Sequence, residues 1–324
     1  MPFFRDIKGQ KTAVKFLSNC LRKERARGSY IFTGPAGTGR ALTAKAFIMA
    51  LFCSQGASSA EPCGRCPACV KTAKLEHPDI CWVKPEKNKN IKIDIIRDIC
   101  GRFCLKPYES EFNVCVLEEA HMMTTEASNA FLKMLEQPPP GALFVLITDK
   151  LERILPTVIS RCVEVRFSSL SATDTKDIII SSGETDEEKA AFLAYFSQGS
   201  PGTALEMLNE DMDRRKQEIL NLISSIVSDD DGACFNWDRE GKDYLAEDVE
   251  MLIMFFRDIA MGKENLEKVM FDKRIIDSGM YRFFEECPLE KIFEIMERLI
   301  NIKLALLGNS NPKLVAQVLP QMVL

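Results

Sequence analysis

Four cysteines concentrated in one short stretch could bind a metal ion. Cys63, Cys66 and Cys69 follow one another at intervals of three residues, and Cys53 lies ten residues before the first. Four thiolates match the tetrahedral coordination of structural Zn²⁺, which leaves no open position for catalysis. Buried free cysteines and an iron–sulfur cluster are the alternatives, but the usual iron–sulfur runs have other spacings and end in Cys-Pro, whereas Val70 follows Cys69. The spacing therefore predicts a structural zinc site.

A glycine-rich loop between a strand-length run and a helical pattern could hold phosphate. Backbone N–H groups of such a loop, together with the positive end of the following helix, can cradle phosphate oxygens. In a working P-loop the last glycine is followed by Lys, for the β- and γ-phosphates, and by Ser or Thr, whose hydroxyl holds Mg²⁺. Here Arg40 and Ala41 stand in those places, so we expect a phosphate or nucleotide site without ordinary ATP turnover. The candidate phosphate-binding residues are Gly34, Gly37, Thr38, Gly39 and Arg40.

Polar side chains at the ends of two later apolar runs could complete a nucleotide site. The run 114–117 is followed by Glu118 and Glu119, where such sites place acids for metal and water, and Thr148 ends the next strand-length run. The alternative is a strand followed by a solvated helix start, where acids are favourable near the positive helix end. For catalysis we prefer that alternative, because Ala41 cannot supply the metal-binding hydroxyl.

The apolar pattern predicts the elements that position these residues. Strand-length runs alternate with helical stretches up to Phe167, which is typical of a parallel sheet covered on both faces by helices. After Phe167 only helical patterns remain, with breaks at Gly183 and at 199–202. The predicted strands are 30–33, 114–117, 143–148 and 163–167. The later apolar runs of helical spacing lie near 222 and over 251–260, 292–306 and 313–324.

Composition and charge indicate a globular chain in a reducing compartment. The chain has 324 residues, 27% of them charged, and a net charge of -5, which suits two or three domains. No stretch reaches the ~18 apolar residues that a membrane span needs, so we expect a cytoplasmic protein with no membrane contact. The first fifty residues hold ten Lys or Arg and two acids. They could form a face for nucleic acid or ordinary solvated helix surfaces.

Taken together, these motifs resemble the bacterial DNA polymerase III clamp-loader subunits of the AAA+ superfamily. In that family the arginine of a Ser-Arg-Cys triplet reaches ATP bound in the neighbouring subunit, so the resemblance implies that Arg161 is an arginine finger acting in trans. A local ion pair with an acid such as Glu164 is the alternative. The resemblance covers most of the chain and rests on the segments 4–10, 34–39, 53–69, 77–79, 91–94, 127–139, 155–156 and 160–162.

The resemblance favours the delta-prime type over the gamma/tau motor. The motor has an intact phosphate loop and a lid arginine, whereas this chain has Arg40-Ala41 in the loop and Gly202 and Thr203 where the lid arginine is expected. A tau-type chain is also expected to continue past residue 324. The delta-prime type implies a rigid, non-hydrolysing subunit with weak or absent ATP binding. An active gamma/tau-type ATPase and a zinc-dependent nucleic-acid adaptor outside replication are the alternatives.

The family also implies an architecture and partners. We expect an α/β AAA+ P-loop domain with a parallel sheet at 1–167, with the zinc knuckle at 53–69. A small helical lid at 168–210 and an all-helical oligomerisation domain, the collar, at 211–324 follow it. The implied partners are gamma/tau and delta subunits in a pentameric ring, the sliding clamp, and primed DNA within the complex.

Overall fold

The computed structural model describes the chain in two compact units. The first unit comprises Met1–Thr185 and Ser197–Leu205, and the second comprises Asp186–Phe196 and Glu206–Leu324. The described residues are 1–55, 60–86, 89–183, 185, 187–209, 242–266, 270, 284–308, 311 and 315.

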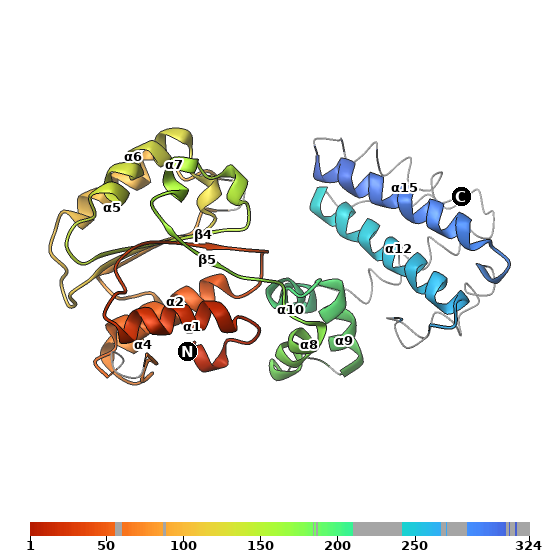
Figure 1. Ribbon diagram of the computed structural model, residues 1–324, viewed down its shortest axis with the longest axis horizontal. Coiled ribbons are helices and arrows are strands. Elements are labelled where there is room, and N and C mark those ends of the chain that lie inside the picture. The colour runs from red at the N-terminus through yellow and green to blue at the C-terminus, as the bar shows by residue number, and fades with distance from the viewer. Residues whose placement is uncertain are drawn as a thin grey trace. The chain divides into compact units, whose positions relative to one another are not determined.

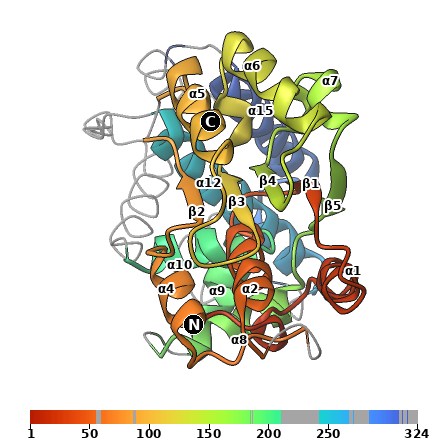
Figure 2. The ribbon, with the colours of Figure 1, turned by 90° about the vertical axis from the view of Figure 1, so that its left-hand side faces the viewer.

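A five-stranded parallel sheet forms the centre of the first unit. Its strand order is β2-β3-β4-β1-β5, which can be followed across Figure 2. The register pairs Tyr30 of β1 with Val145 of β4 and Asn113 of β3 with Ala142 of β4, in parallel. This confirms the predicted parallel sheet. The strands are β1 (Gly28–Thr33), β2 (Ile80–Val83), β3 (Asn113–Leu117), β4 (Ala142–Thr148) and β5 (Val163–Arg166).

The edge strand β2 was not among the predicted strands. It has four residues, and only Ile80 is buried, because β3 lies on one side of β2 and none of the described strands pairs with its other side. Residues 80–83 nevertheless form an apolar run as long as the predicted run 114–117, so the sequence carried a strand signal that was missed.

Helices cover both faces of the sheet (Figure 1). Alternate residues of β1 point to opposite faces, so Tyr30 and Phe32 join the core under α1 and α2, and Ile31 joins the core under α5 and α6. The ring of Phe144 in β4 lies 5.0 Å from that of Phe103 and 5.2 Å from that of Phe131. The helices of the first face are α1 (Lys11–Arg22), α2 (Arg40–Phe52) and α4 (Pro67–Lys74), and those of the second are α5 (Ile93–Phe103), α6 (Thr125–Glu136) and α7 (Pro156–Ile159).

Short helices follow β5, as expected for residues after Phe167. Within the first unit, the N–H of Leu170 donates to the carbonyl of Gly199 at 2.8 Å, which joins the chain before α8 to the chain before α10. α8 spans Ala172–Ser181 and α10 spans Pro201–Asn209. The break expected at 199–202 is shorter than predicted, because α10 already begins at Pro201.

The described part of the second unit is helical. Its helices are α9 (Glu187–Phe196), α12 (Lys242–Lys263) and α15 (Leu289–Leu307), and α12 packs along α15 (Figure 1). The helical runs predicted at 251–260 and 292–306 fall within α12 and α15, whereas those near 222 and over 313–324 lie outside the described residues. Among the described helices, none has the length and apolar character needed to cross a membrane.

Candidate functional site

The glycine-rich loop joins the end of β1 to the start of α2, with glycines at positive φ. Gly34, Gly37 and Gly39 have φ values of 133°, 68° and 89°. A Cβ on Gly34 would lie 2.1 Å from the carbonyl oxygen of Phe167, and a Cβ on Gly37 would lie 2.1 Å from Oγ of Ser200. Neither position has room for a side chain, so this close packing of the loop beside the start of α2 requires glycine at both.

The start of α10 closes directly over this loop. The N–H of Gly202 donates to the carbonyl of Gly37 at 2.9 Å, and Oγ of Ser200 donates to the carbonyl of Ala36 at 2.9 Å. Thr203 Oγ1 lies 2.7 Å from Ser200 Oγ. The two positions where the lid arginine is expected therefore lie against the loop, and Gly202 reaches it through its backbone.

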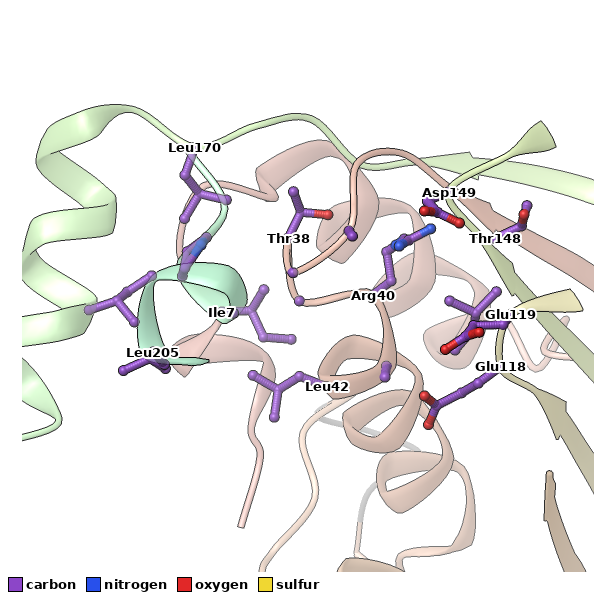
Figure 3. A pocket seen from close by; sticks show the side chains of 18 of the residues that line it. Ile7, Thr38, Arg40, Leu42, Glu118, Glu119, Thr148, Asp149, Leu170 and Leu205 are labelled. Carbon is purple, nitrogen blue, oxygen red and sulfur yellow. The ribbon is translucent and has the colours of Figure 1, made fainter. Parts of the chain in front are cut away.

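Arg40, in the usual place of the P-loop lysine, is buried. Its side chain points toward Asp149 (Figure 3), the residue is 9% exposed, and its buried Nη1 has no hydrogen-bond partner. Burial lowers the pKa of the Arg40 guanidinium, while the negative charges of Asp149, Glu118 and Glu119 oppose that shift. Arg40 thus directs its positive charge toward Asp149 at the carboxyl edge of the sheet.

The acids after β3 have different surroundings. Glu118 Oε1 accepts a hydrogen bond from the indole Nε1 of Trp82 at 2.6 Å, and Glu118 Oε2 lies 3.8 Å from Nζ of Lys84. Glu119 has φ 49° and ψ 46°, a left-handed conformation that non-glycine residues adopt infrequently. Glu118 is therefore held mainly by β2 and the residue after it, while Glu119 occupies a sharp bend at the pocket.

Thr148 belongs to a small polar cluster at the end of β4. Nδ1 of His121 lies 3.1 Å from Oγ1 of Thr148 and 3.3 Å from Oδ1 of Asp149. Burial lowers the pKa of His121, and the charge of Asp149 opposes that shift. A neutral imidazole therefore lies among the polar groups at this edge.

A cavity of about 600 Å³ lies between the loop, the strand ends and the start of α10 (Figure 3). One side is polar and includes Thr38, Arg40, Glu119 and Asp149. Ile7, Leu42, Leu170 and Leu205 lie on the other, apolar side, and Ile178 also lines the cavity. An apolar wall opposite a phosphate-type loop suits a ligand with a flat ring and an anionic group.

The donor groups of this cavity do not fit the metal of an ordinary P-loop. Ala41 has no oxygen on its side chain, and the hydroxyl of the nearby Thr38 donates to the carbonyl of Pro35 at 2.8 Å. The Arg40 side chain, which points toward Asp149, brings a positive charge into the same pocket. The pocket has room for a nucleotide but lacks the hydroxyl that holds Mg²⁺ beside the phosphates.

Arg161 lies apart from this cavity. Its Nη2 pairs with Oε1 of Glu136 at 2.7 Å, and its Nη1 donates to the carbonyl of Thr157 at 2.8 Å. About a third of its side chain, 34%, is exposed. The ion pair joins Arg161 to the end of α6; the partner named as an alternative, Glu164, instead binds Thr33 and Arg166.

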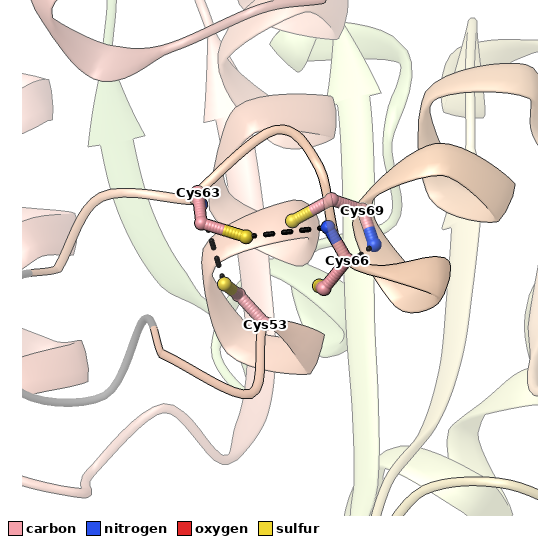
Figure 4. Close-up of side chains that lie close together, drawn as sticks. All are labelled: Cys53, Cys63, Cys66 and Cys69. Carbon is pink, nitrogen blue, oxygen red and sulfur yellow. Dashed lines mark hydrogen bonds between the residues drawn. The ribbon is translucent and has the colours of Figure 1, made fainter.

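The four cysteine sulfurs come together at the end of α2 (Figure 4). All four lie within 4.8 Å of one another, as ligands of one ion must. The N–H groups of Cys63, Cys66 and Cys69 donate to the sulfurs of Cys53, Cys63 and Cys66, respectively, at 3.2–3.5 Å. Burial raises the pKa of Cys66, but its hydrogen bonds, led by that from the Cys69 N–H, outweigh burial and lower it to about 6. This four-thiol set could hold a metal ion such as zinc.

Sequence reasoning missed several residues of the pocket and its surroundings. Asp149 directly follows the predicted site residue Thr148, and His121 lies two residues after the predicted site residue Glu119. The carboxyl ends of β3 and β4 are neighbours in the sheet. That adjacency could have been inferred from a parallel sheet. No local signal marks Trp82 or Glu136, because their partners lie 36 and 25 residues away along the chain.

The comparisons with known proteins point to one replication complex. A family model described as "DNA polymerase III, delta subunit" matches residues 9–171, about half of the chain. DNA polymerase III subunit tau of Bacillus subtilis (strain 168) is 27% identical over 343 residues, covering 97% of this chain and 60% of tau.

Two further relatives belong to the same complex. DNA polymerase III subunit gamma of Buchnera aphidicola subsp. Acyrthosiphon pisum (strain APS) is 33% identical over 211 residues, covering 64% of this chain and 58% of gamma. DNA polymerase III subunit delta' of Bacillus subtilis (strain 168) is 27% identical over 256 residues, covering 77% of each chain. This chain thus spans about three fifths of the length of the tau and gamma relatives.

Proposed function

The chain belongs to the DNA polymerase III, delta subunit family, and from that premise we propose that it is a delta-prime-type subunit of the clamp loader. In this role it helps to load the sliding clamp onto primed DNA and does not hydrolyse ATP itself. One observation carries the proposal: the buried guanidinium of Arg40 and the methyl group of Ala41 stand where a working loop has a lysine and a metal-binding hydroxyl. Gly202 supports it, because it contacts the loop where a motor has its lid arginine.

The proposed partners are gamma/tau- and delta-type subunits in a pentameric ring. Within the ring, Arg161 acts as a finger toward ATP held by a neighbour. Two features favour this role: Arg161 lies outside the cavity of its own chain, and its guanidinium is partly exposed. Its ion pair with Glu136 holds the guanidinium in place in the free chain and must loosen when it contacts phosphate oxygens.

An active gamma/tau-type ATPase is the second candidate. The tau relative covers nearly the whole chain, and the cavity is large enough for a nucleotide. In that case Arg40 would have to act as the P-loop lysine. A planar guanidinium is a poor substitute for a compact ammonium beside phosphates.

We also propose that Cys53, Cys63, Cys66 and Cys69 hold one structural Zn²⁺. The donor set fits zinc because four soft thiolates in one cluster satisfy tetrahedral coordination. When bound, the ion would tie the end of α2 to the start of α4 and so support the fold of the knuckle. The role would be structural, because four cysteine ligands leave no open coordination position for a substrate.

ATP hydrolysis by the purified chain tests the choice between the two candidates. With Mg·ATP and primed DNA, we expect no turnover above a no-enzyme control. The double variant Arg40→Lys, Ala41→Thr should bind nucleotide more tightly but not turn it over rapidly, because Gly202 is unchanged. Turnover by the unmodified chain at the rate of an ordinary enzyme, about 1–10³ s⁻¹, would establish the ATPase instead.

A reconstituted ring tests the role of Arg161. Arg161→Ala should leave ring assembly intact and lower ATP turnover at one site, where a finger in trans can contribute ~10³–10⁵ in rate. The matched control is Arg166→Ala, which also removes an arginine paired with an acid, Glu164, but on β5. Equal ATPase and clamp-loading rates for both variants and the unmodified ring would mean that Arg161 is structural.

A further inference from the structure

Two cysteines outside the four-cysteine cluster lie opposite each other on neighbouring strands. Cys81 of β2 is the register partner of Cys115 of β3, and the two strands lie side by side in Figure 2. Both are free thiols on the same face of the sheet, since Cys115 belongs to the core under α5 and α6 and Cys81 packs against that core. Neighbouring strands are ~4.8 Å apart, and disulfide-bonded cysteines have Cα atoms ~4.4–6.8 Å apart. The backbone therefore places this pair within reach of a disulfide bond.

The two thiols differ in their access to solvent and in their acidity. Cys115 is buried, at 1% exposed, whereas Cys81 on the edge strand is half-buried. A hydrogen bond with the Cys115 thiol, together with the charge of Arg102, lowers the pKa of Cys81 to about 7, although burial opposes this shift. The same hydrogen bond and burial raise the pKa of Cys115. Because the thiolate is the reactive form of cysteine, Cys81 is the nucleophile of the pair and Cys115 is the second thiol.

Arg102 favours a reactive thiol here rather than a metal site. Its Nη2 donates to the carbonyl of Pro78 at 3.0 Å, which holds the guanidinium near the start of β2. A positive group stabilises a nearby thiolate and repels a metal cation. Among the residues that the structure describes, the four-cysteine cluster is the one group of three or more side chains close enough to share an ion. Cys81 and Cys115 therefore lack the third ligand that a metal site would need.

We propose that Cys81 and Cys115 are a reversible thiol pair that peroxide oxidises to a disulfide between β2 and β3. The Cys81 thiolate attacks one oxygen of hydrogen peroxide, the O–O bond breaks, and Cys81 becomes a sulfenic acid. The hydroxide that leaves takes up the proton that Cys81 had released and becomes water. Cys115 then attacks the Cys81 sulfur, so that the S–S bond forms, the S–O bond breaks, and the hydroxyl leaves with the Cys115 proton as a second water. Two thiols thus lose two electrons, and one peroxide is reduced to two waters.

The edge position of β2 allows this bond to form. Among the described strands β2 pairs only with β3, so it can move toward β3 without breaking a second set of strand hydrogen bonds. The next residue, Trp82, donates its indole N–H to Glu118 at the pocket. Oxidation therefore acts on the strand that holds one acid of the cavity. This inference does not depend on the proposed clamp-loader role.

Treatment of the full chain with hydrogen peroxide tests the proposal. The reduced protein receives stoichiometric peroxide, its remaining thiols are blocked, and its disulfides are mapped by mass spectrometry of peptides. The zinc content is measured before and after, so that oxidation of the four-cysteine cluster is detected separately. We expect a Cys81–Cys115 link, the loss of two free thiols per chain, and the recovery of both thiols with dithiothreitol.

Three variants assign the roles of the two thiols. Cys115→Ala should leave Cys81 as a sulfenic acid, which dimedone traps, whereas Cys81→Ala should leave Cys115 reduced. Cys100→Ala is the matched control, because Cys100 packs against the same core from α5, and it should form the same link as the unmodified chain. A link from Cys81 to a cysteine other than Cys115, or a Cys81 that stays reduced in the unmodified chain, would overturn the pair. Mapping of the unmodified chain decides this even if a variant does not fold.

Discussion

Replacing Gly202 by alanine tests how tightly α10 is joined to the glycine-rich loop. A Cβ on Gly202 would lie 2.7 Å from Cα of Gly37 and 3.1 Å from the Gly37 carbonyl oxygen. Both atoms belong to the backbone, so no flexible side chain can move aside. The same carbonyl accepts the hydrogen bond from the N–H of Gly202 at 2.9 Å. The new methyl group must therefore push α10 away from the loop or distort the loop.

Three contributions determine the expected change in the free energy of unfolding for Gly202→Ala. Insertion of a methyl group into a packed contact costs ~1–3 kcal/mol, and weakening of the hydrogen bond costs ~0.5–1.5 kcal/mol. Alanine regains at most ~1 kcal/mol from helix propensity, and less at the second residue of a helix. We therefore expect Gly202→Ala to lower the free energy of unfolding by roughly 1–3 kcal/mol. For a unit of this size that corresponds to a fall of about 2–10 °C in melting temperature.

Gly101→Ala is the matched control. Gly101 also lies in a helix, α5, but a Cβ on it would meet nothing within 4 Å. The control should therefore be as stable as the unmodified chain or more stable by up to ~1 kcal/mol. Urea unfolding of the full chain, followed by circular dichroism, measures both variants. If Gly202→Ala were as stable as Gly101→Ala, the close contact between Gly202 and Gly37 would not restrain α10 and our reasoning would be refuted.

Three further predictions concern other parts of the first unit. Elemental analysis of the unmodified protein should give about one zinc ion per chain. Cys66→Ser should lose this zinc and destabilise the knuckle. A full zinc content in the variant would reject the site. Burial lowers the pKa of His77 and His121 from 6.5, so near and below that pH the unfolded chain binds more protons than the folded chain. The free energy of unfolding should therefore fall as the pH drops below about 6.5. A urea midpoint that stays the same from pH 7.5 to 5.5 would contradict this. The Asp79 carboxylate accepts hydrogen bonds from the N–H groups of residues 108–110. Asp79→Ala should therefore lower the free energy of unfolding in urea by at least ~2 kcal/mol. A variant of unchanged stability would exclude that role.

The sequence alone determined the features that depend on short spacings. Apolar runs of strand length, separated by helical stretches, predicted the parallel sheet and four of its strands. The cysteine spacing predicted a cluster that the structure brings within 4.8 Å, because three of the four residues lie within one knuckle. Arg40 and Ala41 predicted a loop without the usual metal-binding hydroxyl, and that prediction is untested. Each of these inferences uses residues close enough in the chain for local geometry to bring them together.

Only the tertiary structure decided which distant residues meet. Arg161 pairs with Glu136 rather than Glu164, because α6 ends beside it, whereas Glu164 is taken by Thr33 and Arg166. The start of α10 reaches the glycine-rich loop, although Ser200 and Ala36 are 164 residues apart in the chain. Such contacts depend on how the sheet and helices pack, and the side chains involved show no periodicity that would reveal them. The same packing buries Arg40 and directs its side chain toward Asp149, which lies 109 residues further along the chain.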